Sequence, residues 1–145
     1  SALAAGFGRA ELMADLTAGA SAGYVRVQGT HSESDDYEDG DGKEVHSEYH
    51  RWSGNATLGW TPDEQTLIEL TGGASDGEAA YADRAMDGSK FLRQNVGLRA
   101  KRTMASGWMK TIEAQLYRND VDHVMDNYSL RAFTPSMMSG PSART

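Results

Sequence analysis

A two-residue alternation over residues 51–60 constrains the fold more than any other feature of this sequence. Small and apolar residues occupy every second position and polar residues the positions between them: Trp52, Gly54, Ala56, Leu58 and Trp60 against Arg51, Ser53, Asn55 and Thr57. Successive side chains of a β-strand point to opposite faces, whereas a helix repeats every 3.6 residues or so. The pattern therefore predicts a strand with one apolar face.

The same alternation recurs along the chain and predicts about six strands in all. The other five segments are 12–18, 24–30, 66–71, 92–101 and 112–117. Between two of them, Pro62 and Asp63 predict a tight turn, because Pro fixes φ and Asp favours turn conformations. Consecutive strands joined in this way predict an all-β, antiparallel meander.

The predicted connections differ systematically in length. Short turns near Ser21, Pro62 and Ser106 alternate with long polar segments at 32–47, 74–90 and beyond 122. Outer-membrane β-barrels have short turns on one side and long loops on the other. Trp60 and Trp108 adjoin short turns, where the aromatic girdle of a barrel lies. A soluble β-sandwich shows the same alternation and remains the alternative.

About six strands are fewer than the roughly eight of the smallest usual closed barrel. The two outermost strands would also need neighbours. We therefore expect residues 1–145 to be a partial β-barrel domain. No run of residues approaches the roughly 18 apolar residues of a membrane helix.

Composition and motifs argue against several classes of function. The net charge is −7 and the 14 Lys and Arg residues are dispersed, which disfavours a nucleic-acid partner. The chain has no cysteine, which excludes disulfides and thiolate sites within it. Since no G-x-S-x-G, H-E-x-x-H or phosphate-binding glycine motif occurs, we predict that the protein is not an enzyme.

Two polar segments invite a metal-site interpretation. The acidic run 35–44 lacks the ligand spacing of an EF-hand, with Tyr37 and His46 at positions that need oxygen ligands, and is predicted to be a solvated loop. His46 and His50 share one face of an extended segment, but no third zinc ligand is evident nearby. Ordinary polar positions on a strand leaving a loop are the alternative for both histidines.

The methionines give a second candidate site. Met86, Met125, Met137 and Met138 fall in the predicted long-loop regions rather than on the apolar faces. Thioether ligands favour Cu(I) over harder cations, and His123 lies two residues before Met125. From these residues alone, both copper ligation and simple packing remain open.

Longer stretches resemble a known family, the bacterial TonB-dependent copper receptors. The resemblance lies in Gly23–His31, Asp36–Gly40, Trp60–Glu64, Tyr81–Ser89 and Val121–Asn127. It extends from about Gly23 to Met138 and follows ordered runs through strands, turns and loops.

The resemblance implies a segment of an outer-membrane barrel of about 22 strands, closed by a plug domain that these residues lack. Such receptors import copper with energy passed on by TonB through the plug, so copper, TonB and outer-membrane lipid are the implied partners. Met86 and Met125 become thioether ligands, with His123 as a ligand or close neighbour. Cu(I) is the preferred ion and Cu(II) a possible one. Without a thiolate from the plug, two thioethers bind copper weakly.

Two other functions remain open from the sequence. The segment could belong to a TonB-dependent receptor for a metal chelate, in which Tyr81 and Arg84 grip the organic ligand. It could also be a structural or adhesive surface module whose acidic loops contact partners and whose methionines only pack.

Overall fold

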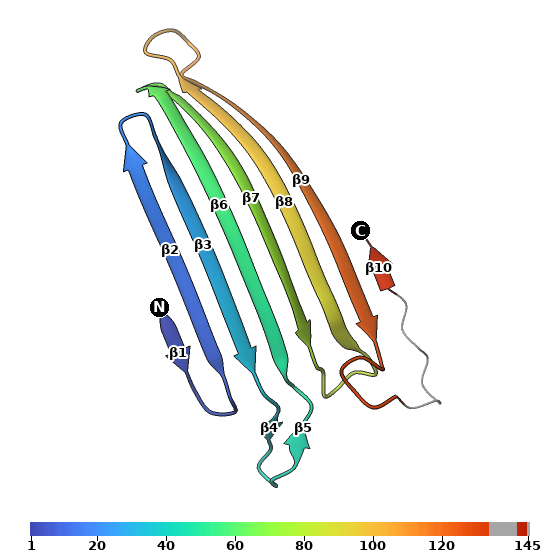
Figure 1. The fold of residues 1–145 in the computed structure, drawn as a ribbon. Coiled ribbons are helices and arrows are strands. Elements are labelled where there is room, and N and C mark those ends of the chain that lie inside the picture. Colours follow the sequence, from blue (N-terminus) through green and yellow to red (C-terminus); the bar gives the residue numbers. More distant parts are fainter. Residues whose placement is uncertain (134–141, 145) are drawn as a thin grey trace.

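The computed structural model describes residues 1–133 and 142–144, which form a curved antiparallel sheet in the order β1-β2-β3-β6-β7-β8-β9-β10 (Figure 1). Its six long strands are β2 (Ala10–Ala20), β3 (Gly23–Ser34), β6 (Tyr49–Asp63), β7 (Thr66–Ala79), β8 (Asp87–Thr103) and β9 (Thr111–Asp126). The short strands β1 (Ala2–Ala4) and β10 (Ser142–Arg144) line its two edges, and β4 (Tyr37–Glu38) pairs with β5 (Glu44–Val45) outside it. The predicted all-β meander is confirmed.

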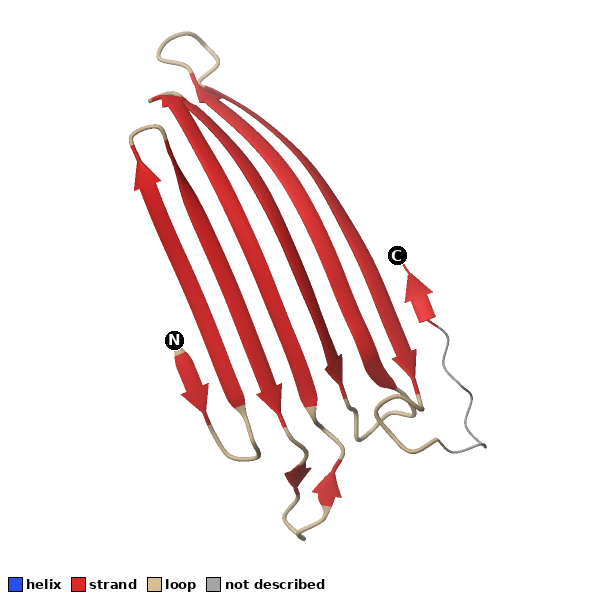
Figure 2. Ribbon diagram, in the orientation of Figure 1, coloured by secondary structure: helices blue, strands red, loops and turns tan. Residues whose placement is uncertain are grey.

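The two-residue turns at 21–22 and 64–65 lie at one end of the sheet, which we call the short-turn end, together with the 104–110 connection (Figure 2). The connections 5–9, 35–48 and 80–86 lie at the other end, so the predicted short turn near Ser106 is no shorter than the 80–86 connection. At the short-turn end, the Thr61 amide donates to the Ala22 carbonyl over 2.9 Å, which ties the end of β6 to the β2–β3 hairpin. Trp60 and Trp108 lie at this end and are 55% and 90% exposed. The described residues contain no helix long and apolar enough to cross a membrane.

The turn between β6 and β7 lies two residues later than the sequence predicts. Asp63 pairs with Thr66, so Glu64 and Gln65 form the tip, and the Asp63 carboxylate accepts a hydrogen bond from the Gln65 amide at 2.9 Å. The register shifts between Trp60 and Asp63. Pro62 lies in this irregular stretch, where its missing amide hydrogen costs no ladder bond. The predicted Pro-centred turn is therefore a proline at a strand irregularity.

The strands also extend further into the predicted long loops. β7 continues to Ala79 and β8 begins at Asp87, which leaves only residues 80–86 between them. Likewise β9 continues to Asp126. The alternation fades in these stretches because both faces are polar there, so a hydropathy pattern cannot mark the strand ends.

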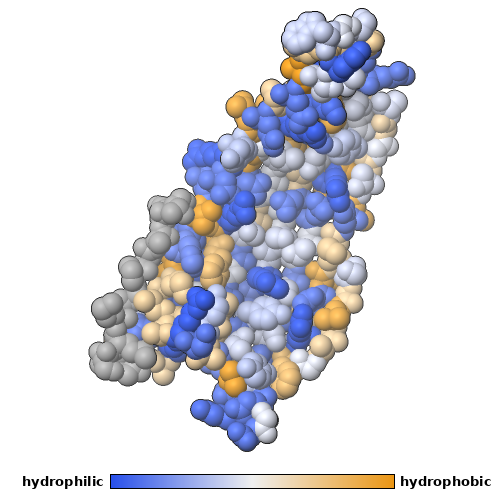
Figure 3. Space-filling model, turned by 180° about the vertical axis from the view of Figure 1, so that it is seen from behind, coloured by the Kyte–Doolittle hydropathy of each residue, from blue (hydrophilic) through white to orange (hydrophobic). Residues whose placement is uncertain are grey.

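The sheet has two contrasting faces, as the alternation predicts. On one face a row of leucines crosses four strands in register, and all four side chains are between 45% and 72% exposed: Leu58, Leu70, Leu98 and Leu116. We call this the outer face. The opposite, polar face carries hydrophilic residues over its middle (Figure 3).

The apolar stretch of the outer face has the height of a membrane. Trp52 and Trp60 bracket it on β6, roughly 26 Å apart along the strand at about 3.3 Å per residue. Outer-membrane barrels have an apolar band about 25 Å tall between aromatic girdles, and tilted strands shorten the projected height. Ala80 is the one buried hydrophobic residue among those described. The sheet therefore presents its apolar side chains outward and has almost no core.

Charged side chains on the polar face link strands to one another. Arg99 donates to Glu69 at 2.9 Å and to Glu113 at 2.8 Å, which joins β7, β8 and β9. The Tyr24 hydroxyl donates to Glu69 from two strands away. Its ring passes over Gly59, where a Cβ atom would lie 2.1 Å from the ring. Position 59 of β6, the strand between those of Tyr24 and Glu69, thus requires a glycine.

Candidate functional site

His123 lies on β9, near the long-loop end of the sheet, and faces Phe91 of β8. The two residues are register partners, and their ring centroids are 4.5 Å apart. The Nε2 atom of His123 is buried and has no hydrogen-bond partner among the described residues. A buried polar atom without a partner costs free energy, which makes such an atom a candidate for binding a ligand.

Met125 and Met86 lie within a few residues of His123. Met125 is two positions further along β9, so its side chain leaves the same face of the strand as that of His123. Its register partner is Gly88, two residues after Met86. Both methionines are half-buried. Met125 lies within β9 rather than in a loop as predicted, while Met86 ends the 80–86 connection.

A buried carboxylate, Asp87, holds the chain next to Met86. It is fully buried and pairs with Arg131, whose Nε atom donates to it at 2.6 Å. It also meets the His46 imidazole at 3.0 Å and accepts from the Tyr81 amide at 2.9 Å. Burial raises the pKa of Asp87, but these hydrogen bonds outweigh it and lower the pKa to about 2. The carboxylate thus joins three loops at neutral pH.

A second buried carboxylate, Asp126, fixes the chain after Met125. It accepts hydrogen bonds from the Ser89 and Ser129 hydroxyls, each at 2.7 Å. The neighbouring Asn127 is 1% exposed, and both polar atoms of its side chain lack partners among the described residues. Together with the Nε2 atom of His123, three buried polar atoms without a partner therefore lie between residues 123 and 127, at the end of β9 and the start of the following loop.

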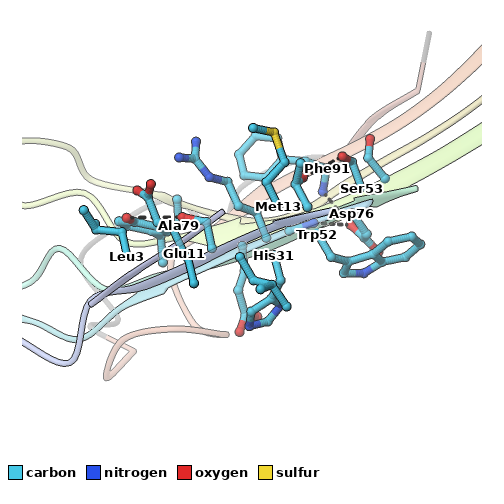
Figure 4. Close-up of a pocket in the computed structure, with 18 of the residues that line it drawn as sticks. Leu3, Glu11, Met13, His31, Trp52, Ser53, Asp76, Ala79 and Phe91 are labelled. Atoms are coloured by element: carbon cyan, nitrogen blue, oxygen red, sulfur yellow. Dashed lines mark hydrogen bonds between the residues drawn. The ribbon is translucent and has the colours of Figure 1, made fainter. Parts of the chain in front are cut away.

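The polar face is hollowed into an open groove of about 940 Å³ that runs from β1 and β2 to β8. Phe91, which covers His123, is among its lining residues. In Figure 4, Met13, Ser53 and Phe91 point to one side of the sheet, whereas His31 and Trp52 point to the other. Met13 therefore adds a third described thioether to the polar face, far along the sheet from β9.

The structure places some of the sequence-predicted site residues near one another. It brings Met125, His123 and the end of the 80–86 connection together, while Met137 and Met138 lie outside the described residues. Asp87, Arg131 and Asn127 were missed, because burial by loops leaves no periodic signal in the sequence. Arg131 is an isolated Arg after β9, and Asp87 begins β8 as part of an Asp-Gly pair, so the sequence gives no reason to link the two residues.

The suggested pairing of His46 with His50 does not occur. His46 contacts Asp36 and Asp87, at 3.8 Å and 3.0 Å. His50 instead lies edge-on to His31, with ring centroids 4.8 Å apart. The acidic run also folds differently from a simple loop, because it contains β4 and ends at the first residue of β5. There Asp39 caps the turn by accepting from the Asp41 and Lys43 amides.

Of three comparisons with known proteins, only the one with solved structures finds a match. A scan against family profiles and a search of curated proteins each find no match. Among solved structures, the chain is similar to the copper transporter OprC, with 48% sequence identity and a TM-score of 0.89.

That match covers 97% of this chain and 22% of the transporter, so the chain spans about a fifth of its relative's length. Identity at this level over nearly the whole chain, together with the shared fold, indicates common ancestry and not only a similar fold. The relative is a transporter and not an enzyme. The chain is therefore a homologue of one segment of that transporter, and its antiparallel meander matches part of the transporter's β-barrel.

Proposed function

We propose that the receptor to which this segment belongs imports copper, and that His123 and Met125 bind the ion on the inner side of the barrel wall. Met86 is the second thioether ligand. The observation that carries the proposal is the buried Nε2 atom of His123, which has no partner among the described residues and lies two positions from a thioether on the same face. The similarity to a copper transporter supports it independently.

The donor set favours Cu(I). Thioethers are soft, polarisable ligands that select Cu(I), and imidazole accepts copper in either oxidation state. The set carries no anionic ligand, so it discriminates against hard divalent cations such as Mg²⁺ and Ca²⁺. For the same reason the segment binds copper weakly by itself. We expect the remaining ligands to come from the plug domain.

The surroundings of the proposed ligands keep them in place. Phe91 covers the imidazole of His123 and shields it from water. Asp87 and Asp126 fix the backbone on either side, one residue from Met86 and one from Met125. Ligands held by their neighbours lose less conformational entropy when the ion binds. TonB supplies the energy for import through the plug, and the outer face contacts lipid.

Copper competition measures the proposal directly. Intact receptor in detergent is titrated with Cu(I) against a colorimetric chelator, comparing wild type with Met86→Ala, His123→Ala and Met125→Ala. We expect each substitution to weaken binding at least about tenfold, the smallest loss typical of disturbing a metal site. Met109→Ala is the matched control, because Met109 lies near the short turns at the opposite end. Unchanged affinity in all three variants would reject the ligand assignment.

A chelate receptor is the second candidate. The Arg84 guanidinium stacks over the Tyr81 ring at 4.9 Å, and Tyr81 lines the groove on the polar face. Such a cationic aromatic pair suits an organic chelate better than a bare ion. If Tyr81→Ala and Arg84→Ala abolish uptake of a copper chelate while Cu(I) affinity stays intact, the cargo is the chelate. If neither substitution changes uptake, the chelate alternative is rejected.

A further inference from the structure

A second group of metal-ligating side chains lies on the other face of the wall. Figure 4 shows His31 on the side of Trp52, away from Met13 and Phe91. His31 and Glu33 belong to β3, and His50 belongs to β6. Glu33 is the register partner of His50, and His31 is the partner of Trp52, so the three side chains share the outer face.

The geometry of this His31–Glu33–His50 cluster fits a transition-metal ion. One donor atom from each residue lies within 4.8 Å of the other two. The Nε2 atom of His31 and a carboxylate oxygen of Glu33 are already 3.1 Å apart. A tetrahedral ion bound at about 2.0–2.1 Å requires donors roughly 3.3 Å apart. To complete the set, donor atoms that are now up to 4.8 Å apart must move closer together.

The neighbouring positions favour a cation. The register partners of the cluster on this face are Ala10, Leu12, Trp52 and Glu78. None of them is basic, and Glu78 lies opposite His50 and adds a second negative charge. The side chains of His31 and Glu33 are 40% and 47% exposed, which leaves the cluster open to ions from solution.

We propose that His31, Glu33 and His50 form a surface site for Cu²⁺ or Zn²⁺ at the outer rim of the barrel wall, separate from the lumenal ligands. Two imidazoles and one carboxylate suit these borderline ions, and Cu²⁺ binds such sets more tightly than Zn²⁺. Three protein ligands leave a fourth position for water or an anion. The level of Trp52 places this site where the apolar band ends, so an ion reaches it from water.

Copper spectroscopy tests this site apart from the proposed lumenal one. Intact receptor carrying His123→Ala is loaded with one equivalent of Cu²⁺, and electron paramagnetic resonance reports nitrogen coupling to the ion. We expect coupling to two imidazoles, lost on adding His31→Ala or His50→Ala. Glu33→Gln should weaken binding at least about tenfold. Glu38→Gln makes the same charge change on β4 and should leave binding unchanged.

A second readout covers variants that fail to fold. Zn²⁺ should protect His31 and His50 of the wild-type receptor from modification by diethyl pyrocarbonate, as mapped by mass spectrometry, while His46 serves as the reference. Absence of protection, or a Cu²⁺ spectrum that the two histidine substitutions leave unchanged, would overturn the surface site. Neither result bears on Cu(I) binding at His123, so the two proposals fail independently.

Discussion

Phe91 and His123 face each other across β8 and β9, with their ring centroids 4.5 Å apart and their planes inclined by 31°. Phe91 also lies against Gly88, where a Cβ atom would be 2.1 Å from its ring. The ring therefore occupies the space between Gly88, which is the register partner of Met125, and the imidazole of His123. It separates the proposed copper ligands from the water of the groove.

Removing the Phe91 ring should expose His123. In Phe91→Ala, we expect severalfold faster modification of His123 by diethyl pyrocarbonate, because its buried nitrogen becomes accessible to solvent. Mass spectrometry of peptides measures the rate, with the exposed His50 of the same protein as the internal reference. Equal rates in the variant and the wild type would show that something other than Phe91 shields His123.

Replacing Arg131 should release the 80–86 connection. Breaking a buried ion pair costs about 3–5 kcal/mol, because it leaves the partner charge uncompensated. In Arg131→Met, Asp87 loses that partner, so we expect the connection before Met86 to open. Limited proteolysis should cut within 80–86 much faster than in wild type. Arg118→Met is the control, since Arg118 pairs with Asp120 on the exposed part of β9. Similar cleavage in the two variants would contradict the role of the buried pair.

Acid should have the same effect through Asp87. Its pKa is lowered to about 2 in the folded protein from an ordinary value of 3.8, so the unfolded segment binds the proton more tightly. The carboxylate then stabilises the loops by about 2 kcal/mol above pH 4 or so, and this contribution disappears as the pH falls towards 2. Hydrogen exchange of residues 80–86 should rise over that range. Asp87→Asn should remove this step and exchange faster at neutral pH.

A methyl group at Gly59 should disrupt the polar face. Gly59→Ala places a Cβ atom into the Tyr24 ring and should displace its hydroxyl from Glu69. Overpacking of this kind costs about 1–3 kcal/mol. Gly54→Ala on the same strand meets nothing within 4 Å and should be neutral. Unfolding of the receptor by denaturant in detergent measures both variants. Equal stabilities would show that the Tyr24 ring moves aside freely.

A charge in the leucine row should destabilise the barrel in lipid. In Leu70→Arg, the charge lies in the row between Leu58 and Leu98, two register positions from the level of Trp60. Arg on the lipid face of a barrel costs about 2–4 kcal/mol at the bilayer midplane and about 0–1 kcal/mol near the interfaces, so we expect an intermediate cost at this level. Thr71→Arg, on the polar face one residue away, should cost much less. Reversible folding into vesicles compares the two, and similar costs would mean that the assignment of the faces is wrong.

Much of the fold could be predicted from the sequence because membrane and water impose a strict alternation. Leu58, Leu70, Leu98 and Leu116 each belong to a predicted strand, and their neighbours are polar. The pattern weakens above Trp52, where both faces meet water. This is why the ends of β7 and β9 were predicted too early and the start of β8 too late. The turn at Pro62 was misplaced for another reason, since a Pro at a strand irregularity resembles a Pro in a turn.

The site was predictable only where chemistry marks single residues. His123 and Met125 are conspicuous as a soft pair two positions apart. Their surroundings depend on contacts between distant segments, such as Arg131 with Asp87 and Phe91 with His123. His31 and His50 were missed as a pair because their proximity follows from the register of β3 with β6. His46 and His50 are close along the chain, and the sequence-based hypothesis paired them for that reason. The His31–Glu33–His50 cluster instead forms between residues that pair across β3 and β6.

The exposed leucine row also affects the life of the chain before it reaches a membrane. In lipid these side chains cost nothing, but in water the same row is a contiguous apolar surface, which promotes association with other chains. The sheet has almost no core with which to hide it. In water the segment should therefore associate with other chains unless another surface covers the leucine row.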